Sequence, residues 1–373
     1  MDEARRIETT IGFCAGFISL CLVPALFAPY AADAATLQPG DIVVTDVGSG
    51  MLLQINPQTG VQTIISSGGH FFNPWGVAVE ASRSVLVVDT DAFGGGVQRH
   101  GGVIRVDPST GGQTVVSSGG FFKTPRGIAL DGNGGILVVD RDAFNDDPGP
   151  GGACDDGGAV IRVDGTTGDQ TVVSSLEHFC DPQGITVDDA GSIWIADHTG
   201  FNGGSGEGKF GGSLIRVDPV TGAQTVVSSG GEFFNLNGVA TETSGSIIAS
   251  REGSAGRSGE LIRVDPSNGL QSIVATKFSS PHGIVFDNHE TLLVADWFTT
   301  SAILSVDPVS GNTTTISSGG FLNLPTGIAV VLVPLPSAAA TGVMAIMLLA
   351  AVRAVQERRR SSRHSADRTD GGR

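Results

Sequence analysis

The stretch Ile104-Arg105-Val106-Asp107-Pro108 decides the fold, because it returns along the chain. The first four letters recur at 161–164, the full segment recurs at 215–219 and 262–266, and changed copies stand at 304–308 and 55–57. The five clearest aspartates are 57, 54, 47 and 42 residues apart. The repeating unit is therefore constant while one insertion varies in length, and such a spacing is typical of the blades of a β-propeller.

Each repeat predicts four short strands. The inner strand is exemplified by residues 127–130, the second by 136–139 and the fourth by 113–116, while the third carries the repeated segment. The letters Asp-Pro-x-Thr-Gly join the third strand to the fourth, where proline fixes φ and glycine accepts a positive φ. We therefore expect the repeated aspartates to form turns.

The number of inner strands sets the number of blades. Each predicted inner strand begins at a glycine, and there are six: Gly76, Gly127, Gly184, Gly238, Gly283 and Gly327. The chain enters at a second strand, 42–44, and ends on an inner strand, 328–331. The last inner strand must then complete the first blade, which removes exposed sheet edges. We predict one all-β domain over 35–333, a six-bladed β-propeller with four-stranded blades.

The pattern Pro125-x-Gly127-Ile128-Ala129-Leu130-Asp131, followed by Ile136-Leu137-Val138-Val139-Asp140, resembles the NHL repeat. It also resembles the wider group of six-bladed propellers that includes gluconolactonase, the peptide-amidating lyase and virginiamycin B lyase. The resemblance covers residues 41–332. It implies the fold but no single chemistry, because these relatives perform unrelated tasks on one scaffold.

The two ends predict export. Arg5 and Arg6 precede an uncharged stretch at 11–28, and Ala32-Asp33-Ala34 supplies small residues for cleavage, so 1–34 is a predicted signal peptide. At the other end, 337–352 carries no charge and precedes an arginine cluster. Residues 334–373 are therefore a predicted tail with a transmembrane helix and a cytoplasmic, arginine-rich end.

The sequence Val333-Pro334-Leu335-Pro336-Ser337 resembles the VPLPA variant of the PEP-CTERM sorting signals of Gram-negative bacteria. The resemblance implies that an exosortase removes the tail and releases the protein from the inner membrane toward the periplasm, cell surface or extracellular matrix. A permanent single-pass anchor is the alternative.

Composition limits the partners. The 55 glycines suit short strands and tight turns, and the formal net charge of −16 disfavours nucleic acid and anionic membrane surfaces. We expect membrane contact through the tail alone.

One face of the propeller carries long insertions after the second strand, at 91–101, 142–158 and 198–212. Loops over a rigid scaffold commonly carry binding residues. Cys154 and Cys180 fall on this face of one blade, so we predict a disulfide in the oxidising compartment; two free thiols are the alternative.

Around the mouth of the channel, the residue before each inner-strand glycine differs from blade to blade. These candidate ligand contacts are Trp75, Arg126, Gln183, Asn237, His282 and Thr326, and the non-repeating Trp297 joins them. In gluconolactonase-type relatives this ring holds a divalent metal through carboxylates and Asn, a pattern that Asn237 alone fits. In the amidating lyase it supplies zinc-binding His, which His282 alone fits.

Carboxylates form a second candidate site. Asp89, Asp91, Asp140 and Asp142 stand at matching points after second strands and suit Ca²⁺ or another divalent metal. Alternatively the first Asp of each pair hydrogen-bonds a turn, since Asp46, Asp197 and Asp296 recur likewise.

Two functions remain open. The first is an exported, surface- or matrix-displayed, non-catalytic propeller that binds a glycan, peptide or protein. The second is a divalent-metal-dependent, lactonase-like hydrolase or lyase. No nucleophile elbow, P-loop or His-Glu-x-x-His pattern is present, so no catalytic residues are assigned and the first hypothesis is preferred.

Overall fold

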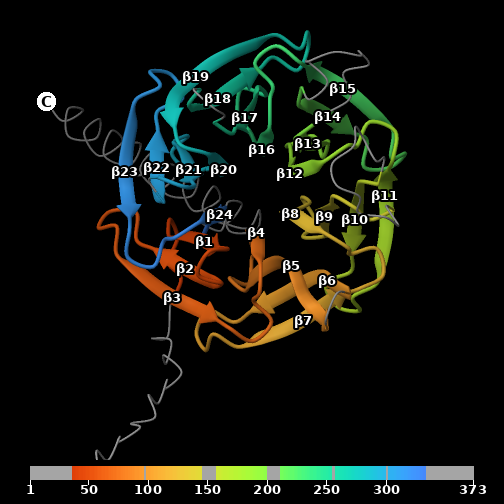
Figure 1. The fold of residues 1–373 in the computed structure, drawn as a ribbon, viewed down its shortest axis with the longest axis vertical. Helices are drawn as coiled ribbons and strands as arrows, with labels where there is room; N and C mark the ends of the chain where they lie inside the picture. The colour runs from red at the N-terminus through yellow and green to blue at the C-terminus, as the bar shows by residue number, and fades with distance from the viewer. Residues whose placement is uncertain are drawn as a thin grey trace, which may run out of the picture. The chain divides into compact units, whose positions relative to one another are not determined.

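A computed structural model describes residues 36–95, 98–144, 157–199, 211–253, 257–299 and 301–332. These residues form six four-stranded antiparallel sheets arranged radially around a central axis (Figure 1). The inner strands of neighbouring sheets contact one another all the way around the ring. The predicted six-bladed β-propeller is therefore confirmed.

Blades 1 to 3 follow one another along the chain. Blade 1 consists of β24 (Pro325–Val330), β1 (Ile42–Asp46), β2 (Met51–Ile55) and β3 (Gln62–Ser67). Blade 2 consists of β4 (Pro74–Val79), β5 (Val85–Gly95), β6 (Gln98–Val106) and β7 (Gln113–Ser118). Blade 3 consists of β8 (Pro125–Leu130), β9 (Ile136–Asp140), β10 (Ala159–Val163) and β11 (Gln170–Ser175).

Blades 4 to 6 repeat this order. Blade 4 consists of β12 (Pro182–Val187), β13 (Ile193–Asp197), β14 (Ser213–Val217) and β15 (Gln224–Ser229). Blade 5 consists of β16 (Leu236–Thr241), β17 (Ile247–Arg251), β18 (Gly259–Val264) and β19 (Gln271–Phe278). Blade 6 consists of β20 (Pro281–Phe286), β21 (Leu292–Asp296), β22 (Ala302–Val306) and β23 (Thr313–Ser318).

The ring closes by the predicted splice. β24 pairs antiparallel with β1, so that Ile42 lies opposite Val330. Just beyond the paired strands, the Gly40 N–H donates to the Val331 carbonyl at 2.8 Å, and the Val331 N–H donates to the Asp41 carbonyl at 2.9 Å. Both ends of the described body therefore leave from one face, at the opposite end of the strands from the loops that precede the inner strands.

The inner strands begin two residues before the predicted glycines. Pro74 already pairs with Asp89, and a bulge then shifts the register before Val77 pairs with Val87. The glycine in the bulge is required by close packing between blades, because a Cβ on Gly238 would lie 2.2 Å from the His282 carbonyl oxygen of the next inner strand. The repeated glycines thus mark the closest approach of neighbouring blades.

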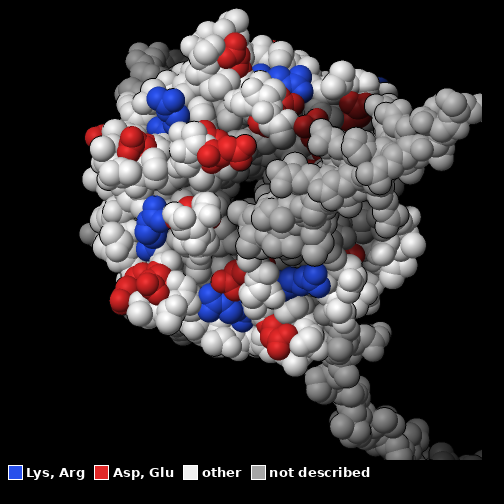
Figure 2. Space-filling view, turned by 180° about the vertical axis from the view of Figure 1, so that it is seen from behind, with Lys and Arg blue, Asp and Glu red and all other residues white. Residues whose placement is uncertain are grey.

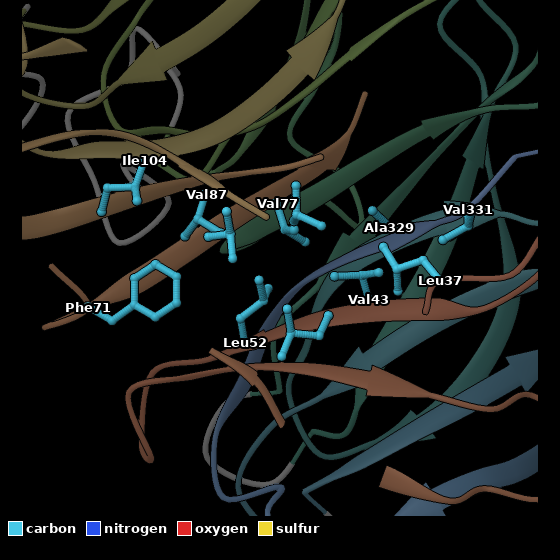
Figure 3. Packing of buried hydrophobic residues seen from close by; sticks show 12 residues of the cluster. Leu37, Val43, Leu52, Phe71, Val77, Val87, Ile104, Ala329 and Val331 are labelled. Carbon is cyan, nitrogen blue, oxygen red and sulfur yellow. The ribbon is translucent and has the colours of Figure 1, made fainter. Parts of the chain in front are cut away.

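The hydrophobic core lies between blades as well as within them. In one cluster, Val43 and Leu52 of blade 1 pack with Val77 and Val87 of blade 2, and Phe71 from the loop between the blades joins them (Figure 3). All five side chains are buried. Each blade is therefore stabilised by its neighbours, as burial of apolar surface requires in a repeat architecture.

A glutamine latch also joins neighbouring blades. Gln170 of β11 donates to the Ser117 hydroxyl and the Gly119 carbonyl, both at 3.0 Å, and accepts from the Phe121 N–H at 2.8 Å. Equivalent latches are made by the glutamines that begin four other outer strands: Gln62, Gln113, Gln224 and Gln271. Between blades 5 and 6, Ala275 and Thr313 stand at the serine and glutamine positions, so that junction cannot form the latch.

The first predicted insertion, 91–101, is not simply a loop. β5 and β6 continue into it as a two-stranded extension in which Phe93 pairs with His100. The glycines at 94–96 and 101 obscured this extension, because glycine in a sequence favours a loop interpretation.

Most of the other two insertions, at 145–156 and 200–210, lies outside the described residues. The predicted signal peptide, sorting motif and transmembrane helix also lie outside them. Within the part of the chain that the structure describes, no helix is long and apolar enough to cross a membrane.

Candidate binding site at the mouth of the central channel

The second residue of each inner strand lines a cavity of about 100 Å³ on the channel axis. All six predicted positions of the ring contribute to its wall: Trp75, Arg126, Gln183, Asn237, His282 and Thr326. Thr326 differs from the other five because its hydroxyl is already hydrogen-bonded to backbone, to the carbonyls of Thr45 and Pro74 at 3.2 and 3.1 Å. The ring therefore offers five variable side chains on a common scaffold.

The loops before the inner strands share this end of the channel with the residues that follow the second strands. The Trp297 N–H donates to the Ser280 carbonyl at 2.9 Å, and the His198 N–H donates to the Asp181 carbonyl at 2.9 Å. This repeated hydrogen bond places the residue after each second strand at the rim of the mouth.

Aromatic rings form one side of the mouth. Trp75 reaches past the small Thr326 toward blade 6, where its ring centre lies 5.7 Å from that of His282 and 5.9 Å from that of Trp297. The His282 and Trp297 centres are 4.3 Å apart, and Phe298 stacks on Trp297 at 5.0 Å. Trp297, singled out in the sequence because it breaks the repeat, therefore lies beside two residues that line the cavity, Trp75 and His282.

Arg126 lies against this aromatic group. Its guanidinium carbon is 4.0 Å from the centre of the Trp75 ring, a cation–π contact. Burial, followed by the charge of Arg141, lowers the pKa of Arg126 to about 10, so the side chain is a cation at neutral pH. Its Nε has no hydrogen-bond partner in the described structure.

His282 is buried and neutral. Burial is the main reason that its pKa falls to about 3, and the nearby His198 and Arg126 lower it further. Its Nε2 has no partner in the described structure, and neither do Asn237 Nδ2 and Trp297 Nε1. The mouth thus gathers unpartnered nitrogen atoms from several blades.

The opposite side of the mouth is a charged network centred on Asp181. Its carboxylate accepts from Gln183 Nε2 at 2.5 Å and lies 3.4 Å from Arg141 Nε and 3.5 Å from His198 Nδ1. His198 Nε2 is in turn 3.7 Å from Glu252. The sequence analysis missed Asp181, Arg141 and Glu252 as site residues. Arg141 and Glu252 follow second strands, at a position whose residue differs in every blade.

The four candidate metal ligands separate into two kinds. The Asp89 carboxylate accepts from the Phe72 and Asn73 N–H groups at 2.8 and 2.9 Å, and the Asp140 carboxylate accepts equivalent bonds from Lys123 and Thr124. Asp46, Asp197 and Asp296 form the same contact in three other blades. Such turn bonding is the structural role weighed from the sequence.

Burial raises the pKa of Asp89 to about 6 and that of Asp140 to about 7, even though their backbone hydrogen bonds act in the opposite direction. The second aspartate of each pair, Asp91 or Asp142, lies at the rim. Asp91 accepts from Asn73 Nδ2 at 2.5 Å, and Asp142 lies 3.6 Å from Arg141 Nε. Among the described residues, no group of three or more His, Cys, Asp or Glu is arranged to hold a metal ion. The calcium hypothesis stays a prediction.

Blade 5 departs from this pattern. Arg251 replaces the repeated aspartate, is 1% exposed, and pairs with Glu260 of the adjacent strand at 2.7 Å. Its Nη2 also donates to the Ser258 carbonyl at 3.2 Å. The loop before β16 consequently lacks the carboxylate that the other five loops share.

Cys180 is disulfide-bonded, and its N–H donates to the Asp197 carboxylate at 2.8 Å. Its partner lies outside the described residues, so the pairing with Cys154 stays a prediction.

Comparisons with known proteins agree with the architecture. The NHL repeat family matches residues 179–202, which include Cys180, Asp181 and the inner strand of blade 4. A solved structure titled "Crystal structure of Nidogen/Laminin Complex" is similar with a TM-score of 0.59 and 13% identity, covering 79% of this chain and 99% of that chain. This likeness shows the fold alone. A comparison with curated proteins finds no match.

The chain is thus a six-bladed propeller in which one segment, residues 179–202, matches the NHL repeat.

Proposed function

We propose that this protein is a non-catalytic binding propeller that recognises its ligand at the channel mouth. One observation carries the proposal. At the inner-strand position that lines the cavity, the scaffold repeats around the ring while the side chains differ in every blade. Three residues that line the cavity, Arg126, Asn237 and His282, carry nitrogens without a hydrogen-bond partner in the described structure, and so does Trp297 beside His282. Buried polar groups are normally hydrogen-bonded, so such a gathering favours a ligand site over a structural one.

Electrostatics favours a small molecule or a protein over nucleic acid as the ligand. The formal net charge of −16 opposes nucleic-acid binding, and acidic and basic side chains are interspersed over the described part of the one face that Figure 2 shows. A nucleic-acid site would require a continuous basic surface to neutralise phosphates.

Export and display complete the proposal. The signal-like segment 1–34 and the VPLPA-like motif favour an exported precursor that an exosortase processes for the cell surface or matrix. The chain leaves the propeller, in the direction of the predicted tail, from the face opposite the mouth, because β24 ends beside the start of β1. The mouth would then point away from the membrane for as long as the tail is attached.

The experiment that tests the binding role compares it with the lactonase-like alternative. The purified full-length protein is analysed for bound metal and assayed for lactone hydrolysis. We expect no turnover, with or without added Ca²⁺, Mn²⁺ or Zn²⁺. Stoichiometric metal together with turnover that is abolished by His282→Ala would replace the binding proposal with an enzymatic one.

Export is tested separately by the mass of the mature protein. Cleavage after Ala34 and removal of the tail near Val333 are expected in a host that carries an exosortase. Retention of residues 1–34 in the mature protein would contradict the predicted export through a cleaved signal peptide.

A further inference from the structure

The chemistry of the mouth indicates what kind of ligand it takes. The mouth presents three nitrogen groups that can act only as hydrogen-bond donors: Arg126 Nε and Asn237 Nδ2 belong to residues that line the cavity, and Trp297 Nε1 belongs to the rim beside His282. None has a partner in the described structure, and the Asn237 residue is 8% exposed. A buried donor without a partner is unfavourable, so these groups favour a hydrogen-bond acceptor as the occupant of the mouth.

The charge of Arg126 specifies this acceptor further. The guanidinium lies on Trp75, and no carboxylate of the described residues forms an ion pair with it. The guanidinium is partly buried and is attracted by Asp181, Asp142 and Asp91 without forming an ion pair with them, and its planar geometry matches that of a carboxylate. The inner end of the ligand is therefore expected to carry a carboxylate.

The outer rim has the opposite polarity. Asp91, Asp142, Asp181 and Glu252 surround the mouth, and Arg141 is the accompanying cation. A simple anion would be repelled by these carboxylates, whereas an ammonium group would be attracted to them. The outer end of the ligand is therefore expected to be a cation.

The size of the cavity sets a further limit. At about 100 Å³ it is well below the ~300–1,000 Å³ of pockets that enclose a drug-sized ligand. The channel can hold a small molecule or a single head group.

We propose that the mouth binds a small zwitterion of amino-acid type, with its carboxylate on Arg126, Asn237 and Trp297 and its ammonium group toward Asp181 and Glu252. This inference rests on the proposed binding function and specifies its ligand class.

Three probes of similar size test the inference by titration calorimetry on the purified full-length protein. L-Alanine carries both charged groups, propionate lacks the ammonium group, and ethylamine lacks the carboxylate. L-Alanine is expected to bind, and each of the other two about tenfold more weakly or worse, as the loss of a charged hydrogen bond predicts. No heat of binding with L-alanine, or propionate binding as tightly as L-alanine, would overturn the inference.

Two arginine variants locate the site. Arg126→Gln is expected to weaken L-alanine binding by about tenfold or more, because it removes the cation and keeps a polar side chain of similar length. Arg216→Gln is the matched control, since Arg216 is exposed on β14. Arg126→Lys keeps the charge and should retain part of the affinity. Equal weakening by Arg126→Gln and Arg216→Gln would contradict the assignment.

The outcomes separate this inference from the broader proposal. If D-glucose binds in a manner sensitive to Arg126→Gln and L-alanine does not, the zwitterion inference fails and the mouth remains a recognition site. If L-alanine binds but the protein turns over a lactone with bound metal, the non-catalytic proposal fails and the ligand class stands.

Discussion

The glutamine latch makes a quantitative prediction about the cohesion of the ring. Gln170 connects blade 3 to blade 2 by three hydrogen bonds, at 3.0, 3.0 and 2.8 Å. Replacing Gln170 by alanine removes all three and leaves the Ser117 hydroxyl its bond to the Gly168 carbonyl. The substitution therefore isolates the latch from the rest of the junction.

The expected loss of stability follows from the number and exposure of these bonds. A net contribution of about 0.5–1.5 kcal/mol per hydrogen bond gives about 2 kcal/mol in total, toward the lower end because water replaces some partners at this half-buried position. With a urea m-value of at least ~2 kcal/mol/M, the midpoint of unfolding should fall by up to about 1 M.

Urea unfolding followed by tryptophan fluorescence measures the effect, since all three tryptophans lie in the propeller. Gln58→Ala is the control, because Gln58 is exposed in a turn and should change stability by less than about 0.5 kcal/mol. The double variant Gln170→Ala/Ser117→Ala should be less destabilised than the sum of the single variants, because both remove one shared bond. If Gln170→Ala behaved like Gln58→Ala, the latch would contribute nothing and the reasoning would be refuted.

Three further predictions concern stability. Installing the missing latch with Ala275→Ser and Thr313→Gln should raise the free energy of unfolding by about 1–2 kcal/mol in the same urea assay, and an unchanged midpoint would show that this junction has a different geometry. Burial raises the pKa of Asp140 to about 7, above its unfolded value of about 3.9, so its stabilisation is complete below about pH 4 and lost as the pH rises through about 7. Wild type should therefore lose stability relative to Asp140→Asn between pH 5 and pH 8 in urea titrations at both values, and a constant difference would argue against the raised pKa. If Cys180 pairs with Cys154, the denatured, unreduced mature protein should contain no free thiol, and reduction should cost roughly 3 to 4 kcal/mol by loop entropy; two titratable thiols would disprove the pairing.

The architecture was predictable because the physical demands of a blade recur in every repeat. Gly238 must be glycine, since a Cβ there would meet the backbone of the next blade, and the same demand recurs at the other inner-strand glycines. The ring closure was also predictable, because the first strand in the sequence occupies the second position of a blade and the last strand occupies the inner position. A structural requirement that recurs in all six blades produces a sequence repeat, and such a repeat is visible in a single sequence.

Features that occur once were harder to predict. The extension of β5 and β6 runs through glycines, which carry no alternation of polar and apolar side chains. Asp181 was missed because its role depends on distance: the 3.4 Å contact with Arg141 joins neighbouring blades, and the 3.5 Å contact with His198 joins residues 17 positions apart in one blade. No periodicity in the chain encodes such a contact.

Six blades provide an internal alignment within one chain, but departure from the repeat does not by itself identify a functional residue. Arg251 replaces the repeated aspartate and pairs with Glu260 on the neighbouring strand. Its Nε and Nη1 have no partner in the described structure, but Arg251 does not line the cavity. Ala275 likewise breaks the latch far from the cavity. Arg126 breaks its repeat too, but it faces the channel with an unpartnered Nε beside unpartnered groups from other blades. The residues that define the candidate site are therefore those that satisfy two conditions at once: they differ from their counterparts in the other blades, and the fold leaves their polar atoms unpaired at a shared cavity.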